Sequence, residues 1–102
     1  MHVITRKRLL AFATTHPDLT EPLDRWYRLA HKANWKNIRD VRLVLPHADA
    51  IHVASGNIVT VFNIGGNHCR LVAGIHYDRG KLFVLAVLTH AEYTRGLWKE
   101  KL

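Results

Sequence analysis

The spacing of apolar residues changes from a helical period to a strand period near residue 50, and this change limits what the chain can fold into. Upstream, residues 20–33 carry apolar side chains at steps of three and four, as on one face of a helix: Leu23, Trp26, Tyr27, Ala30 and Ala33. Downstream, residues 51–88 contain short β-branched and aliphatic runs separated by glycine-containing turns. Helices in one half and consecutive strands in the other predict an α+β domain with an antiparallel sheet.

The first half is predicted to contain one short strand and three helices. The strand is expected at residues 2–4, and the helices at residues 5–15, 20–33 and 38–43. Prolines limit these helices, because a proline inside a helix removes a hydrogen bond and clashes with the preceding turn. Pro17 therefore ends the first helix, and Pro46 limits the third. We expect the helices to pack on one face of the sheet.

The second half is predicted to contain four strands and a closing helix. The strands are expected at residues 51–53, 58–64, 67–77 and 82–88. Two consecutive glycines, Gly65 and Gly66, favour a two-residue hairpin loop, because glycine readily takes the positive φ angles that such a loop needs. A phosphate-binding glycine loop is the alternative, but the spacing matches neither the P-loop nor the dinucleotide motif. The last strand is apolar throughout, which is typical of a strand inside a sheet.

A length of 102 residues with 48% hydrophobic side chains suits one globular domain, residues 1–102, with a single core. The one cysteine, Cys69, excludes an intramolecular disulfide and a cysteine-rich zinc site. The acidic residues after position 50 are only Asp78, Glu92 and Glu100, which are too few for a magnesium-binding cluster. We therefore expect no metal and no other cofactor.

The charge is strongly positive, because 15 lysines and arginines stand against 8 acidic residues, for a formal net charge of +7. A basic domain of this size commonly binds a polyanion such as nucleic acid, an acidic protein or a membrane surface, although charge also serves solubility alone. No secretion signal is recognisable, and the longest apolar run, residues 82–88, is too short to span a membrane. A cytoplasmic protein without membrane association is therefore expected.

Pairing across the Gly65–Gly66 loop sorts the side chains of the two long strands onto two faces. A two-residue loop places Val61 opposite Arg70. One face is then almost entirely apolar and is expected to form the core: Ile58, Thr60, Phe62, Ile64, Cys69, Leu71, Ala73 and Ile75. The other face brings Asn63, His68 and Arg70 together beside small apolar residues.

Residues 89–92 match a capping box, S/T-x-x-E, at the start of the final helix. The box by itself accounts for Thr89 and Glu92. His90 and Tyr93 stand three residues apart and therefore share one face of that helix. The free backbone N–H groups of a first helical turn favour an anion near His90.

Arg70 is the expected neighbour of this helix start. A two-residue loop at Arg79-Gly80 places Arg70 opposite Thr89, whereas a longer loop shifts the register. By itself, His90 fits an ordinary surface histidine better than a catalytic one. An arginine beside it makes proton transfer next to a bound phosphate a reasonable function.

A basic face with a histidine and few carboxylates suits one reaction on an anionic polymer. The 2′-hydroxyl of RNA attacks the adjacent phosphodiester when a base accepts its proton, an acid protonates the leaving 5′-oxygen and cations stabilise the phosphorane. His90, Tyr93, Arg70 and Lys36 provide these types of group. We expect His90 and Tyr93 to exchange protons, with base and acid unassigned between them. Arg70 and Lys36 are expected to bind the scissile phosphate.

Two segments of the chain resemble a known family. Residues 62–72, Phe-Asn-Ile-Gly-Gly-Asn-His-Cys-Arg-Leu-Val, followed by residues 89–93, Thr-His-Ala-Glu-Tyr, resemble the HigB type of toxin in the RelE-like group of bacterial type II toxin–antitoxin systems. The similarity extends over nearly the whole chain, including its first residues, residues 35–37 and the region of Pro46. The glycine–asparagine–x–x–arginine hairpin combined with the closing motif makes the resemblance specific.

This resemblance implies an mRNA interferase, an endoribonuclease that cleaves mRNA in the A site of a translating ribosome and so inhibits translation. It implies neutralisation by a cognate antitoxin, here a HigA-like protein with a helix-turn-helix domain. The family pattern is matched at Asn67, Arg70, His90 and Tyr93, and Lys36 occupies a commonly basic position. The implied fold is a small RelE-like domain, with N-terminal helices on one face of an antiparallel sheet and a short C-terminal helix.

Further polar residues are candidates for contact with RNA. Asn67 is expected to shape the hairpin or touch RNA, and His68 lies where relatives vary. The helix faces carry basic residues expected to contact ribosomal RNA through charge alone: Arg6, Lys7, Arg8, Arg25, Arg28 and Lys32. Two other hypotheses stay open at this point: a non-catalytic module that binds RNA or protein, and a degenerate toxin that acts as a scaffold or regulator. Tests of RNA cleavage and of toxicity distinguish both from the enzyme.

Overall fold

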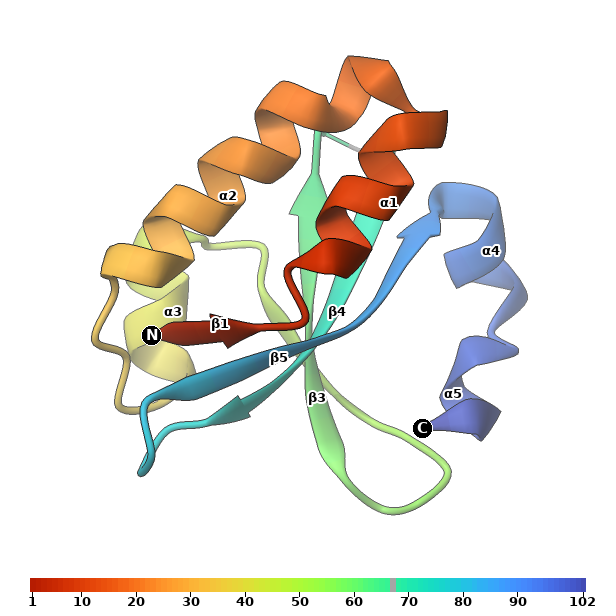
Figure 1. Cartoon of the computed structure of the whole chain (residues 1–102). Helices are drawn as coiled ribbons and strands as arrows, with labels where there is room; N and C mark the ends of the chain where they lie inside the picture. The colour runs from red at the N-terminus through yellow and green to blue at the C-terminus, as the bar shows by residue number, and fades with distance from the viewer. Residues whose placement is uncertain (67) are drawn as a thin grey trace.

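The computed structural model describes residues 1–66 and 68–102. A short strand and a helical half precede the hairpins of the sheet (Figure 1). In chain order the elements are β1 (His2–Ile4), α1 (Lys7–Thr15), the 3₁₀ helix η1 (Pro17–Leu19), α2 (Thr20–Lys32), α3 (Ile38–Val44), β2 (Asp49–His52), β3 (Ile58–Ile64), β4 (Cys69–His76), β5 (Lys81–Thr89), α4 (His90–Arg95) and α5 (Trp98–Lys101). Every predicted strand and helix is present, and η1 and α5 are additional.

Within the described residues, five strands form one sheet in the order β1-β5-β4-β3-β2. Strands β2 to β5 pair antiparallel, as predicted. The first strand differs, because β1 pairs parallel with β5 and makes the sheet mixed. β5 therefore lies between β1 and β4, which explains why its sequence is apolar throughout. The α+β class, with the N-terminal helices on one side of the sheet and a short C-terminal helix, is confirmed.

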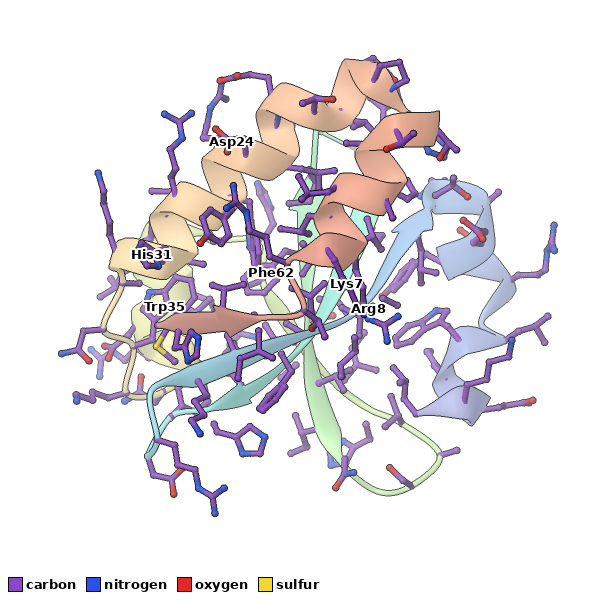
Figure 2. The ribbon with its side chains drawn as sticks, viewed as in Figure 1. Lys7, Arg8, Asp24, His31, Trp35 and Phe62 are labelled. Atoms are coloured by element: carbon purple, nitrogen blue, oxygen red, sulfur yellow. The ribbon has the colours of Figure 1, made fainter. Side chains whose placement is uncertain are left out.

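The sheet face that the sequence predicted to be apolar forms the main core beneath the N-terminal helices (Figure 1). Figure 2 shows Trp35 and Phe62 on this side of the sheet, and both side chains are buried. The ring of Phe62 lies 6.4 Å from the Trp35 ring and meets the Trp26 ring edge-on at 5.3 Å. Large aromatic side chains bury the most area, so this trio is a main source of stability. Other buried residues of the cluster are Leu9, Leu23, Ala30, Val41, Ile64, Cys69, Leu71, Ala73, Leu82 and Val84.

The opposite face of the sheet carries a second, smaller apolar cluster. Its buried members are Val53, Val59, Val61, Val72 and Trp98. The short helices α4 and α5 lie along this side, to the right in Figure 1, and α5 supplies the tryptophan. The second face is thus partly covered by the end of the chain, which the sequence did not predict.

The β3–β4 hairpin has a longer loop than the glycine pair predicted. Asn63 pairs with Arg70, so the loop spans residues 65–68. The expected pairing of Val61 with Arg70 is therefore wrong by two positions. Since successive side chains alternate between the faces, a shift of two residues leaves every side chain on its predicted face.

The β4–β5 hairpin also departs from the predicted register. Its loop spans residues 77–80 instead of two residues, and a β-bulge further along the hairpin shifts the pairing by one residue in the compensating direction. As a result Arg70 pairs with Leu88, and its expected pairing with Thr89 is wrong by one position. Leu88 lies close to the end of β5, so Arg70 still stands beside the start of α4.

The two glycines of the β3–β4 loop allow a matched test of packing against η1. Both have a positive φ, so alanine at either position is strained by about 1 kcal/mol. A Cβ at Gly65 would lie 2.7 Å from Cδ2 of the buried Leu19, whereas nothing lies within 4 Å of a Cβ at Gly66. We expect Gly65→Ala to lower the free energy of unfolding in urea by about 1 kcal/mol more than Gly66→Ala. Equal losses in the two variants would contradict this packing argument.

Candidate active site

Arg70, His90 and Tyr93 lie together where the second face of the sheet meets α4. Arg70 belongs to β4, and the other two residues share one side of α4. The Nη2 atom of Arg70 is 3.4 Å from Nδ1 of His90. The guanidinium carbon lies 5.5 Å from the centre of the Tyr93 ring, in a cation–π arrangement. The structure therefore makes these three groups neighbours, although they come from separate elements.

The capping box positions His90 at the start of α4. The Thr89 hydroxyl accepts a hydrogen bond from the Glu92 N–H at 3.2 Å, and the Glu92 carboxylate accepts one from the Thr89 N–H at 2.9 Å. These bonds satisfy N–H groups that a helix start leaves free. The His90 N–H instead donates to the carbonyl of His68 at 3.3 Å, which ties α4 to the β3–β4 loop.

Arg70 is a charged side chain held within the sheet. The residue is only 8% exposed, although a guanidinium group is strongly hydrated in water. Its Nη1 donates to the carbonyl of Cys69 at 3.3 Å. Asn63 on β3 and Leu88 on β5 are its neighbours across the two strand pairs. A guanidinium fixed between rigid strands is suited to bind a phosphate, whose oxygens match its parallel N–H groups.

Burial raises the pKa of the Tyr93 phenol above its ordinary value of 10. The carboxylate of Asp49, at the start of β2, acts in the same direction, and the Arg70 guanidinium opposes both. The phenol is therefore protonated at neutral pH and presents an O–H group. The sequence did not indicate a role for Asp49, because its strand reaches this part of the sheet only through the pairing of β2 with β3 and of β3 with β4.

The contact with Arg70 defines the hydrogen-bond roles of its two partners. A guanidinium group only donates hydrogen bonds, so Nδ1 of His90 is the acceptor in this contact. His90 is thus held beside the guanidinium, with Nδ1 directed towards it.

Sequence analysis missed one residue that contacts this site, Trp98 of α5. Its indole ring stacks on the Tyr93 ring, with centroids 5.3 Å apart and 20° between the ring planes. Gly96, with φ of +77°, ends α4 and redirects the chain towards the sheet. The glycine was the only available signal, because it predicts the end of a helix but not where the following residues pack.

Lys36 is not a neighbour of the three clustered residues. It is exposed in the connection between α2 and α3, where its N–H donates to the Asp40 carboxylate at 2.9 Å. Figure 1 shows this connection and α4 on opposite sides of the molecule. The adjacent Trp35 holds the connection there, because its ring is buried against Phe62. The structure therefore does not bring Lys36 and Arg70 to one phosphate, contrary to the sequence-based expectation.

The predicted RNA-contacting residues on α2 lie in the layer of helices that covers the core face of the sheet. Arg28 and Lys32 are both exposed there. Arg28 pairs with Asp24 at 3.1 Å and with Glu21 at 3.5 Å, and Figure 2 shows Asp24 on the outside of α2. Exposed pairs contribute little to stability, but they reduce the positive potential of this surface.

The β3–β4 loop and the start of α1 hold the other predicted RNA-contacting residues. His68 is exposed in the loop, close to His90 through the backbone bond to α4. The neighbouring candidate Asn67 lies outside the described residues. Lys7 and Arg8 are exposed in the first turn of α1 (Figure 2).

Two negative findings hold for residues 1–66 and 68–102. In that part of the chain, no three histidine, cysteine or acidic side chains are grouped to hold a metal ion. Over the same residues, no helix combines the length and the apolar character needed to cross a membrane. Cys69 is a free thiol, fully buried on the core face as predicted.

Burial of this thiol predicts a loss of stability at alkaline pH. Burial raises the pKa of Cys69 from 9.0 to about 11, and it also raises the pKa of Tyr77 and Tyr93. The unfolded chain therefore loses these protons at lower pH than the folded chain, so stability present below pH 9 falls as pH rises to 11. We expect Cys69 to contribute a loss of about 2 kcal/mol between pH 9 and pH 11, measured by urea denaturation.

The control for the alkaline prediction is Cys69→Ala. The variant retains the contribution of the tyrosines but lacks the thiol, so its stability should depend less steeply on pH between 9 and 11. An identical pH dependence in the two proteins would contradict the assignment to Cys69.

These features define the class of protein. It is a small, basic α+β domain with a guanidinium, an imidazole and a phenol gathered at a junction of sheet and helix. Such a combination suits an anionic substrate whose reaction requires proton transfer.

Comparison with known proteins defines the family. Residues 19–96 match the HigB toxin family, described as the RelE-like toxic component of a toxin–antitoxin system. The chain belongs to this family. It is 31% identical over 93 residues to the mRNA interferase toxin HigB of Escherichia coli K12, covering 91% of this chain and 88% of that protein. It shows the same identity and coverage with the mRNA interferase HigB of Shigella flexneri. The mRNA interferase HigB of Escherichia coli O6:H1 is 26% identical over 95 residues, covering 93% of this chain and 90% of that protein.

Proposed function

We propose that this toxin is an endoribonuclease that cleaves mRNA and thereby inhibits translation. Similarity to proteins named mRNA interferases supports the choice of substrate. The observation that carries the proposal is the contact of the Arg70 guanidinium with both His90 and Tyr93. A cation, an imidazole and a phenol within reach of one another are the groups that transesterification of RNA needs.

The message itself supplies the nucleophile in this reaction. His90 accepts the proton of the ribose 2′-hydroxyl, and the 2′-oxygen forms a bond to phosphorus. The bond from phosphorus to the 5′-oxygen breaks, and Tyr93 donates its phenolic proton to that oxygen. The products are a 2′,3′-cyclic phosphate and a 5′-hydroxyl, and water then carries the proton from His90 back to Tyr93. DNA should resist cleavage because it lacks the 2′-hydroxyl.

We propose His90 as the base and Tyr93 as the acid. Arg70 donates to Nδ1 of His90, and a scissile phosphate that takes over this N–H leaves the Nδ1 lone pair available to accept the 2′-hydroxyl proton. Burial and the charge of Asp49 raise the pKa of Tyr93, so that this phenol holds its proton until the leaving oxygen develops charge.

Arg70 has the role of binding the scissile phosphate. Its position between two strands keeps the guanidinium fixed, so little reorganisation accompanies the build-up of negative charge on the phosphorane. Its hydrogen bond to His90 also places the phosphate beside the base. We propose that one guanidinium thus stabilises charge and aligns the proton acceptor.

The other basic candidates are proposed to bind RNA away from the scissile phosphate. Lys36, Arg28 and Lys32 are exposed and separate from Arg70 in the fold, which suits contact with the phosphate backbone of message or ribosomal RNA. His68 lies beside α4, and we propose that it and Asn67 meet nucleotides next to the cleaved bond. Cleavage on the translating ribosome, in the A site, would use this dispersed charge for docking.

Membership of a toxin–antitoxin family gives the chain an antitoxin partner. We propose that this partner is a HigA-like protein with a helix-turn-helix domain, acting in the cytoplasm where messages are translated. Co-expression with it should prevent the growth arrest caused by the toxin.

Inducible expression with primer extension on a translated message tests the function. The unmodified toxin should arrest growth and produce new 5′ ends within the message. His90→Ala should abolish both effects, because it removes the proton acceptor, while circular dichroism shows that the variant is folded. His47→Ala is the matched control, since His47 is exposed and outside the site, and it should behave like the unmodified toxin. Equal cleavage by His90→Ala would contradict the role of His90 as proton acceptor, and growth arrest without any cleaved message would contradict the proposed function.

A further inference from the structure

The last residues of the chain are anchored to the sheet by Trp98. This side chain is 6% exposed and packs in the second apolar cluster with Val53, Val59, Val61 and Val72. A backbone hydrogen bond of 3.0 Å, from the N–H of Ala54 to the carbonyl of Lys99, attaches α5 to the turn before β3. The end of the chain is therefore fixed to the same rigid sheet that holds Arg70.

Trp98 makes two different contacts with Tyr93. The two rings stack with centroids 5.3 Å apart, and the indole N–H donates to the Tyr93 carbonyl at 3.1 Å. One contact orients the phenol ring, and the other holds the backbone that carries it. Both are needed because α4 has only six residues, and a helix this short is not stable without tertiary contacts.

A series of contacts connects Trp98 to the candidate active site. The Tyr93 ring stacks on Trp98, and the Arg70 guanidinium carbon lies 5.5 Å from the centre of the same ring. Arg70 in turn contacts His90. The indole is therefore the support that links the apolar cluster of the sheet to the groups proposed to act on RNA.

We propose that Trp98 is a positioning residue, which holds Tyr93 at the angle and distance required to protonate the leaving oxygen. This inference rests on the proposed function, because it concerns the same site. It goes beyond the features common to the family match, which covers residues 19–96 and ends before Trp98. Trp98 itself does not touch the reacting atoms in this account, since its ring is buried beneath the phenol.

The test compares substitutions at Trp98 that retain or remove the stacked ring. Trp98→Phe keeps an aromatic ring and loses the N–H donor, Trp98→Leu fills the apolar cluster without a ring, and Trp98→Ala removes both. Leu97→Ala is the matched control, because Leu97 is 56% exposed and adjacent in sequence. Cleavage is measured with purified protein on ribosomes translating a defined message, so that kcat and KM are obtained separately.

A misplaced acid slows the chemical step more than it weakens substrate binding. A lower kcat with an unchanged KM is therefore the result specific to a positioning role. Trp98→Ala and Trp98→Leu should lower kcat by about 10²-fold with KM nearly unchanged. Trp98→Phe should restore most of kcat, and Leu97→Ala should match the unmodified toxin. Should alanine at position 98 prevent folding, the leucine variant decides the question. Unchanged kcat in a folded leucine variant would overturn the proposal.

A second measurement reports the position of Tyr93 without relying on activity. Tyrosine labelled with ¹³C at Cζ gives one NMR signal per phenol, and the Tyr93 signal is identified by its absence in Tyr93→Phe. Because burial is the leading cause of the raised pKa of Tyr93, removal of the ring in Trp98→Leu should shift its titration towards pH 10. An unshifted titration would contradict positioning by Trp98. If the unmodified toxin cleaves no message while the titration of Tyr93 in Trp98→Leu shifts as expected, the proposed function fails and the structural support of Tyr93 stands.

Discussion

Replacing Arg70 by lysine is expected to lower kcat for message cleavage by about 10²-fold. Lysine keeps one positive charge but lacks the planar set of N–H groups that contacts His90 and that we propose binds the phosphate. The loss should fall on kcat, because the guanidinium stabilises charge that develops only in the transition state. The measurement is cleavage of a translated message by purified protein, with folding checked by thermal denaturation.

Arg79→Lys is the matched control for this prediction. Arg79 is exposed in the β4–β5 loop, at the other end of the strand from Arg70, and contributes to no contact in the site. Its substitution should leave kcat and KM unchanged. If Arg70→Lys were as active as Arg79→Lys, the fork-shaped geometry of Arg70 would have no part in catalysis.

Replacing Phe62 by alanine is expected to cost about 3–5 kcal/mol of unfolding free energy, the largest effect we predict on stability. Phe62 is 1% exposed and lies between Trp26 and Trp35, so truncation leaves a cavity that two rigid rings are poorly able to fill. A small domain has only about 5–15 kcal/mol of total stability, so the variant should be largely unfolded at modest temperature. Urea denaturation followed by tryptophan fluorescence measures the loss.

The comparison for Phe62→Ala is Leu43→Ala. Leu43 is 78% exposed on α3, and its removal should change the free energy of unfolding by less than about 0.5 kcal/mol. Phe62→Leu should recover part of the loss, because leucine refills some of the volume. A loss below about 1 kcal/mol for Phe62→Ala would show that the aromatic cluster is loosely packed.

Hydrophobic spacing was sufficient to predict the faces of the sheet. Ile64, Cys69 and Leu71 lie in the main core and Arg70 on the opposite face, although the predicted pairing of β3 with β4 was wrong by two residues. The error did not change the face on which each side chain lies, because side chains alternate with a period of two and the shift was even. Arg70 stayed beside α4 for a different reason, because the loop and the β-bulge together moved its partner by only one residue, from Thr89 to Leu88 near the end of β5.

Sequence reasoning was less reliable where a residue depends on distant packing. Lys36 has the charge expected for a phosphate ligand, but burial of its neighbour Trp35 against Phe62 holds it on the far side of the fold. The parallel pairing of β1 with β5 was not predicted either, because a strand of three residues does not indicate which strand it pairs with. The contact of Trp98 with Tyr93 was not predicted, since nothing near Trp98 in sequence indicates it.

The amino-acid sequence by itself determined the order of helices and strands, the apolar face of the sheet and the capping box that begins α4. These properties depend on neighbouring residues and on periodicity, which a linear chain displays directly. Only the tertiary structure decided the loop lengths, the separation of Lys36 from Arg70 and the support of Tyr93 by Trp98. Those outcomes arise from packing between segments that are far apart in the chain, and packing energy depends on shape in three dimensions rather than on spacing.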